Sequence, residues 1–98
     1  MKKILIDTNI LFQLFKKNVS IDNLKGFELI IPDFIKEEFI YKAKENKLKN
    51  LDVFFENLNK NGFKFLETNY KLNKDADDLL IKLAKELNAY ILTIDKKL

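Results

Sequence analysis

The sequence contains no cysteine and no histidine, and these two absences exclude several catalytic and metal-binding classes. Without cysteine, the chain has no disulfide, no thiolate zinc site and no thiol nucleophile. Without histidine, it lacks the side chain that most often transfers protons near neutral pH. If the protein is an enzyme, we expect carboxylates to carry most of its chemistry.

Arginine is also missing, so all 18 basic residues are lysines, and the formal net charge is +3. This charge suits weak, sequence-independent attraction to a polyanion, but the chain lacks arginine's bidentate recognition of bases. A lysine-rich surface is also an ordinary solvated surface. Charge alone therefore does not identify a nucleic-acid partner.

Glycine and proline are scarce, with two and one residues, and no linker-like segment interrupts the 98 residues. We therefore expect a single domain over residues 1–98. The first apolar stretch, Ile4 to Ile6, stops at Asp7, so it is too short for a secretory signal or a membrane span. We expect no membrane contact and a cytoplasmic location.

Short apolar runs near residues 2–6, 27–31, 63–66 and 90–94 predict four strands. The segments between them place apolar residues at three- and four-residue spacing, which predicts helices. In one of these, Phe54, Phe55 and Leu58 form a stripe that we assign to the core rather than to an interface. The alternation predicts an α/β fold, with three α/β/α layers and a central parallel sheet of about four strands.

Four acids stand where such a fold would bring them together. Asp7 and Asp95 end the first and fourth predicted strands, and ligands bind at the carboxyl ends of parallel strands. Glu38 and Asp77 lie on helices that could face the same edge. Clustered carboxylates repel one another unless a cation compensates them, and oxygen ligands suit Mg²⁺ or Mn²⁺. Such an ion can activate water and neutralise charge on a phosphodiester.

Each acid also has an ordinary explanation. Asp7 could cap the following helix, and Glu38 could be a solvated helix acid beside lysines. Asp77 could serve the positive end of the helix dipole, and Asp95 could be a loop residue. The coincidence of several acids at one predicted edge favours a metal site.

The segment Ile6 to Leu11, with Asp7 and Asn9 inside it, resembles the opening signature of the PIN-domain nucleases. The segment from Ile31 to Phe39 resembles the family's second block, where Glu38 is a better match than Glu37.

Two later segments extend this resemblance over nearly the whole chain. The segment from Asp77 to Ala84 resembles the third block, whose register selects Asp77 over Asp78. The segment from Leu92 to Asp95 is similar to the closing Thr-x-Asp block. All four acidic blocks occur in the family's order.

The resemblance implies a PIN-like fold and a Mg²⁺- or Mn²⁺-dependent endoribonuclease that hydrolyses RNA. It makes Asp7, Glu38, Asp77 and Asp95 the metal-binding and catalytic residues, with Asn9 and Thr93 in support. Lysines that could guide the RNA backbone are Lys16, Lys17, Lys42, Lys74 and Lys96. A toxin of a toxin–antitoxin pair and an RNA-processing nuclease both fit this resemblance.

Family members usually continue into a further helix and a fifth strand, whereas this sequence stops at Leu98. We therefore expect the C-terminal fifth strand to be missing. The open sheet edge could pair with another chain, giving a homodimer or a complex with an antitoxin or other protein. The alternative is a non-catalytic PIN-like module that binds RNA or protein.

Overall fold

A computed structural model describes residues 2–20, 22–70 and 76–93. The strands are β1 (Lys2–Ile6), β2 (Phe27–Pro32), β3 (Lys64–Leu66) and β4 (Tyr90–Leu92). The helices are α1 (Thr8–Phe15), α2 (Asp33–Glu45), α3 (Leu51–Lys60) and α4 (Ala76–Leu87), with a short 3-10 turn, η1, at Asp22–Leu24. These bounds confirm the predicted order of strands and helices.

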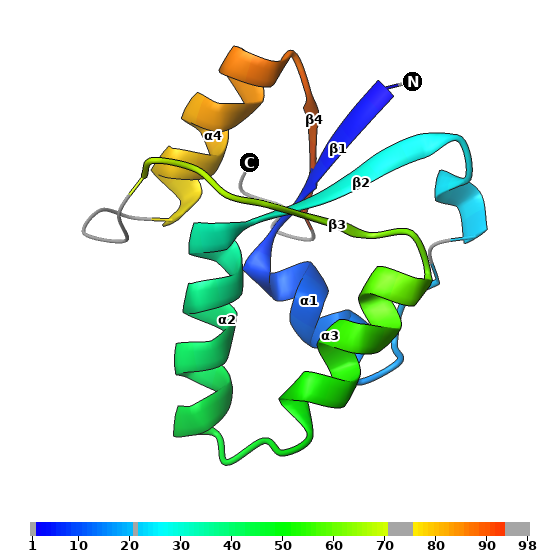
Figure 1. The fold of residues 1–98 in the computed structure, drawn as a ribbon, viewed down its shortest axis with the longest axis vertical. Helices are drawn as coiled ribbons and strands as arrows, with labels where there is room; N and C mark the ends of the chain where they lie inside the picture. The colour runs from blue at the N-terminus through cyan, green and yellow to red at the C-terminus, as the bar shows by residue number, and fades with distance from the viewer. Residues whose placement is uncertain (1, 21, 71–75, 94–98) are drawn as a thin grey trace.

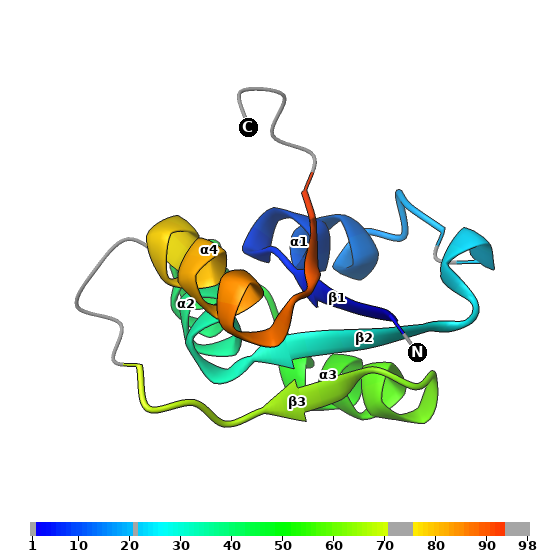
Figure 2. The ribbon, with the colours of Figure 1, turned by 90° about the horizontal axis from the view of Figure 1, so that it is seen from above.

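The four strands form one parallel sheet in the order β3-β2-β1-β4. Figure 2 shows β2 and β3 running side by side in the same direction. The chain passes from β1 to β2 to β3 on one side and then returns to the other side of β1. This reversal makes the carboxyl ends of β1 and β4 the switch point, where α/β sheets commonly bind ligands.

The helices cover the sheet as the sequence predicted. Helices α1, α2 and α3 lie on one side of the strands and α4 lies on the other, which gives three α/β/α layers (Figure 1). Of the helices in the described ranges, none has both the length and the apolar character needed to cross a membrane.

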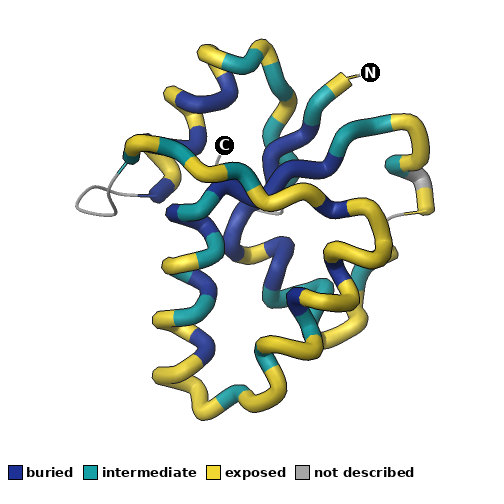
Figure 3. The backbone as a smooth tube through the Cα atoms, in the orientation of Figure 1, coloured by how far each residue is buried: buried dark blue, intermediate teal, exposed yellow. Residues whose placement is uncertain are grey.

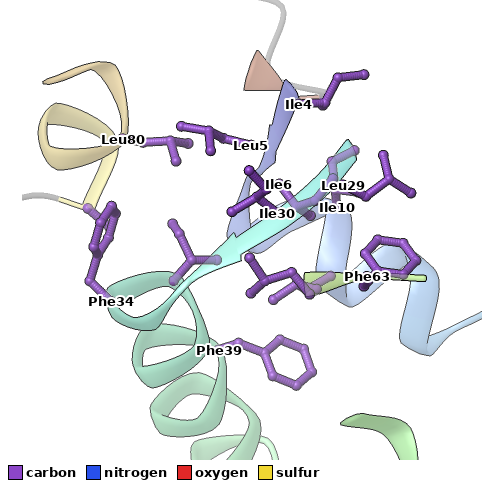
Figure 4. Packing of buried hydrophobic residues seen from close by; sticks show 14 of the residues in the cluster. Ile4, Leu5, Ile6, Ile10, Leu29, Ile30, Phe34, Phe39, Phe63 and Leu80 are labelled. Atoms are coloured by element: carbon purple, nitrogen blue, oxygen red, sulfur yellow. The ribbon is translucent and has the colours of Figure 1, made fainter. Parts of the chain in front are cut away.

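The core forms on both faces of the two central strands. Ile4, Leu5 and Ile6 of β1 are buried, because α4 covers one face and the other helices cover the opposite face. Figure 3 shows the contrast between the buried central strands and the exposed outer turns of the helices. In Figure 4, Leu80 of α4 points toward Leu5 of β1. The hydrophobic effect of covering both faces is the main stabilising contribution.

An aromatic cluster joins α1, α2 and α3. Phe39 is fully buried, and its ring centroid lies 4.6 Å from that of Phe12 and 5.5 Å from that of Phe54. Phe55 and Leu58 are also buried. The prediction that the α3 stripe belongs to the core is therefore confirmed.

The ends of the helices follow local sequence signals. Gly62 has φ of +93°, a conformation that glycine adopts without steric cost, directly after the C-terminus of α3. Its backbone N–H donates to the carbonyl of Asn59, and the next amide, from Phe63, donates to that of Leu58. The chain thus turns sharply from α3 into β3 at this glycine.

Candidate functional site

Asp7 occupies the junction between β1 and α1. It directly follows the strand and caps the helix: its Oδ1 accepts a hydrogen bond of 3.3 Å from the backbone N–H of Asn9. Its carbonyl accepts from the amides of Ile10 and Leu11. The residue is only 4% exposed. The capping explanation of Asp7 is therefore correct, and it places a nearly buried carboxylate at the switch point of the sheet.

Thr93 reaches the same carboxylate from the other side of the switch point. It follows β4, and its Oγ1 donates a 2.7 Å hydrogen bond to Asp7 Oδ2. The backbone N–H of Asp7 donates to the carbonyl of Leu92 at 3.2 Å. These two bonds extend the β1–β4 pairing and bring together residues that are 86 positions apart.

The electrostatic surroundings of Asp7 are unusual for a buried acid. The ion pairs within the described ranges join Glu38 to Lys42 and Glu28 to Lys64, and neither involves Asp7. Taking a carboxylate out of water without a cation is costly unless hydrogen bonds compensate it. Among the described residues, two donors approach the Asp7 carboxylate, whereas a carboxylate has about four lone-pair sites.

Thr8 adds a second oxygen beside this carboxylate in the sequence. It is 2% exposed, and its Oγ1 has no hydrogen-bond partner among the residues that the structure describes. Buried hydroxyls of this kind are rare, because most find a protein or water partner. Sequence reasoning gave Thr8 no role, and its place inside the Asp-Thr-Asn segment was the available signal.

Glu38 lies in α2, one helical turn before Lys42. Its Oε1 is 3.7 Å from Lys42 Nζ, and its side chain is 22% exposed. This i,i+4 pair agrees with the simpler explanation, a helix acid beside lysines, and such pairs contribute little stability. Neighbouring Glu37 is exposed, so Glu38 is the more enclosed of the two candidates.

The structure describes only one of the other two predicted acids. Asp77 lies in the first turn of α4 and is exposed, as is Asp78. Asp95 lies outside the described residues. Over residues 2–20, 22–70 and 76–93, no three acids gather closely enough to enclose a metal ion. The convergence of all four acids therefore stays a prediction.

Asp33 is an acid at the same sheet edge that sequence reasoning left out. It directly follows β2, and its Oδ1 accepts from the backbone N–H of Phe34 at 2.8 Å and from Thr68 Oγ1 at 2.6 Å. Its Oδ2 accepts from the backbone N–H of Thr68 at 2.8 Å. The signal was its position after Pro32, which matches that of Asp7 after Ile6.

The tie between Asp33 and Thr68 continues toward α4. Thr68 Oγ1 accepts from the backbone N–H of Tyr70, whose hydroxyl donates to Glu86 of α4. The hydrogen bond to Glu86 raises the pKa of Tyr70 to about 12, because it favours the protonated phenol. Near the start of β2, a hydrogen bond from Lys64 of β3 lowers the pKa of Glu28. Both interactions are structural.

Two of the predicted lysines lie close together. Lys16 of the α1 C-cap and Lys42 of α2 line one pocket, together with Asn9, Phe12, Gln13, Asn46 and Leu48. Lys17, in contrast, lines a different pocket, beside Phe54. Lys74 and Lys96 lie outside the described residues. The structure thus groups two of the five lysines, next to Asn9.

The chemistry of these donors is that of oxygen ligands, which a hard divalent cation prefers, and binding of such an ion stays a prediction. Asp7 supplies a nearly buried carboxylate with remaining acceptor capacity, and the buried hydroxyl of Thr8 is the next oxygen along the sequence. The sequence offers neither thiolate nor imidazole ligands, so oxygen-preferring ions such as Mg²⁺ or Mn²⁺ suit it better than Zn²⁺.

Comparison with known proteins assigns no family, because the sequence matches no protein-family model and no curated protein sequence.

Proposed function

We propose that this chain is a Mg²⁺- or Mn²⁺-dependent endoribonuclease of the PIN type. The observation that supports it most is the hydrogen bond from Thr93 Oγ1 to Asp7 Oδ2. These residues come from the first and the last of the four segments that resemble the family, and they meet at the switch point of a parallel sheet. A chance resemblance of short segments does not require such contact.

In this proposal, the carboxylates of Asp7, Glu38, Asp77 and Asp95 would hold the cation. A bound ion would supply Lewis acidity toward water and would offset the charge on a phosphodiester. Thr93 and the backbone amide of Asn9 each fix one oxygen of Asp7, so the carboxylate is oriented before the ion binds. The support from Asn9 thus comes through its main chain. Lys16 and Lys42 attract the RNA backbone.

The biological setting also belongs to the proposal. A toxin of a toxin–antitoxin pair and an RNA-processing enzyme both accord with a small carboxylate nuclease in the cytoplasm. Within the described residues, β3 and β4 are the edge strands of the sheet, and an edge strand can pair with a second copy or with an antitoxin.

An RNA cleavage assay tests the proposal. We expect the purified protein to cut a structured RNA in Mn²⁺ or Mg²⁺, and a chelator to stop the reaction. Asp7→Asn keeps the shape of the side chain but removes its charge, so cleavage should fall by roughly 100-fold or more.

Asp33→Asn is the matched control, because it makes the same change after a neighbouring strand, at a carboxylate whose three donors are all neutral groups of the chain. It should cut RNA at the rate of the parent. Equal cleavage by the parent and Asp7→Asn would expose a contaminating nuclease and reject the proposal. Binding of RNA without cleavage would instead favour a non-catalytic PIN-like module.

A further inference from the structure

The pocket between α1 and α2 has an unusual lining. It contains two lysines, Lys16 and Lys42, and three carboxamides, Asn9, Gln13 and Asn46, with Phe12 and Leu48 as apolar members. Among the described residues, no carboxylate lines it. Four other pockets in the described part of the molecule each include at least one carboxylate. The lining therefore suits an anionic ligand that also has an apolar surface and hydrogen-bonding edges.

The pocket is a continuation of the candidate site. One face of α1 carries a stripe about 10 Å long, in which residues follow three- and four-residue spacing. Its members are Asn9, Phe12, Gln13 and Lys16. On α2, Glu38 and Lys42 lie one turn apart, and Asn46 at the C-cap continues that face. Both helices leave the carboxyl edge of the sheet (Figure 1). The stripes thus begin near Asp7 and Glu38 and end in the pocket.

The carboxamides of the pocket keep free hydrogen-bonding atoms. Gln13 uses its Oε1 to accept from Asn18, which leaves its amide nitrogen as a donor. Asn46 uses its Nδ2 to cap the carbonyl of Lys42, which leaves its Oδ1 as an acceptor. Donors and acceptors are therefore both available to the edge of a base.

Phe12 supplies an aromatic surface within the pocket. It packs on Phe39 at 4.6 Å between ring centroids, so the core fixes its position, and part of the ring is left to the pocket. Stacking on aromatic side chains is the usual way in which proteins hold an unpaired base. The pocket volume of about 500 Å³ lies within the ordinary range for small-ligand sites, roughly 300–1,000 Å³.

We propose that this pocket binds one nucleotide of single-stranded RNA, next to the phosphodiester at Asp7. The base lies against Phe12 and Leu48, its edge meets Gln13 and Asn46, and the phosphate contacts Lys16 and Lys42. This inference rests on the proposed function for its substrate. It adds the requirement for an unpaired nucleotide, since a paired base cannot enter the pocket.

Binding can be measured separately from cleavage. The Asp7→Asn protein, kept in chelator, is titrated with a short fluorescein-labelled oligouridylate while anisotropy is followed over a range of salt concentrations. Adding Lys16→Gln should weaken binding by about threefold to tenfold and reduce the salt slope by about 0.7, the value for one lost contact to a single strand.

Lys85→Gln in the same background is the matched control. Both residues are exposed lysines at the C-terminal end of a helix, Lys16 at the end of α1 and Lys85 in the last turn of α4. Helix α4 lies on the other side of the sheet from α1 (Figure 1). Its loss should leave both affinity and salt slope unchanged. Equal effects of the two substitutions, or no measurable binding by the parent, would overturn the pocket assignment.

Two further measurements locate the ligand. In ¹⁵N spectra, the oligouridylate should shift the side-chain amide signals of Asn9, Gln13 and Asn46, and shifts confined to other regions would contradict the assignment. Free uridine monophosphate should compete far less well than the oligonucleotide. Equal competition would identify a mononucleotide site instead.

The two proposals fail separately. Specific binding that depends on Lys16, without cleavage by the wild-type protein in Mn²⁺, would keep the pocket and reject the nuclease. Cleavage that depends on Asp7, with identical binding by the Lys16 and Lys85 variants, would keep the nuclease and reject the pocket.

Discussion

Two aspartate–threonine pairs join neighbouring strands at the carboxyl edge of the sheet. Asp7 and Thr93 link β1 to β4, and Asp33 and Thr68 link β2 to β3. In each pair the aspartate follows a central strand and begins a helix, while the threonine comes after an edge strand. The same local chemistry thus occurs on both sides of the sheet, and the two carboxylates differ in their surroundings.

Within the described residues, Asp33 accepts more hydrogen bonds from its own chain than Asp7 does. Its three hydrogen bonds are 2.6–2.8 Å long and come from two amides and a hydroxyl, and the residue is half-buried. Asp7 is 4% exposed and accepts from one amide and one hydroxyl, the former at 3.3 Å. We infer that Asp33 serves the fold alone, whereas Asp7 keeps the capacity to bind a further positive group.

The largest expected difference between the pairs is in metal-dependent stability. In wild-type protein, Mn²⁺ at roughly a hundred times its Kd should raise the free energy of unfolding by about 2.7 kcal/mol. Asp7→Asn should remove most of this gain, while Asp33→Asn should keep it. Thermal unfolding with and without Mn²⁺ measures both. Equal stabilisation of the two variants by Mn²⁺ would contradict a role in metal binding that Asp7 has and Asp33 lacks.

Without metal, Asp33→Asn should lose more free energy of unfolding than Asp7→Asn. Asp33→Asn must turn an amide nitrogen toward a backbone N–H, either that of Thr68 or that of Phe34, so the free energy of unfolding should fall by about 1–2 kcal/mol. Asp7→Asn removes a buried charge, and asparagine caps helices as well as aspartate does, so it should cost less. Denaturant unfolding in chelator gives the two values.

The threonines provide the next comparison. Thr93→Val removes the donor to Asp7 without a change in side-chain shape, so Mn²⁺ affinity should fall by about 10-fold or more, and Thr93→Ser should restore it. Thr68→Val should lower the free energy of unfolding by about 1 kcal/mol and leave metal affinity unchanged. Titration with Mn²⁺ separates the outcomes, and equal Mn²⁺ affinities for both valine variants would argue against an orienting role for Thr93.

The smallest expected effect is a pH dependence of stability through Tyr70, whose backbone N–H donates to Thr68. Because the pKa of Tyr70 is raised from 10.0 to about 12 in the folded protein, its contribution to stability is complete below pH 10. It should disappear as the pH rises from 10 to 12. Tyr70→Phe should lack this step, so the difference between the two unfolding curves measured against pH isolates it from lysine titration. A wild-type curve parallel to that of Tyr70→Phe would show that the Glu86 bond is not formed.

Much of this arrangement could be predicted from local patterns. The apolar run at residues 2–6 predicted β1, and the three- and four-residue spacing of apolar residues predicted the helices, because both patterns depend on neighbouring residues. The position of Asp7 at a strand-to-helix junction followed from the same patterns. Asp33 was not predicted as a site residue, because the predicted strand ended at residue 31, whereas β2 continues to Pro32 and places Asp33 directly at its end.

The pairing of distant residues could not be predicted in this way. The sequence by itself determined the parallel α/β alternation, the absence of thiol and imidazole chemistry, and the acids at strand ends. The tertiary structure decided that Thr93 contacts Asp7 and that Thr68 contacts Asp33, and it formed the pocket beside Asn9. Strand order and helix packing bring these groups together, and they depend on the energy of the whole core rather than on any local segment.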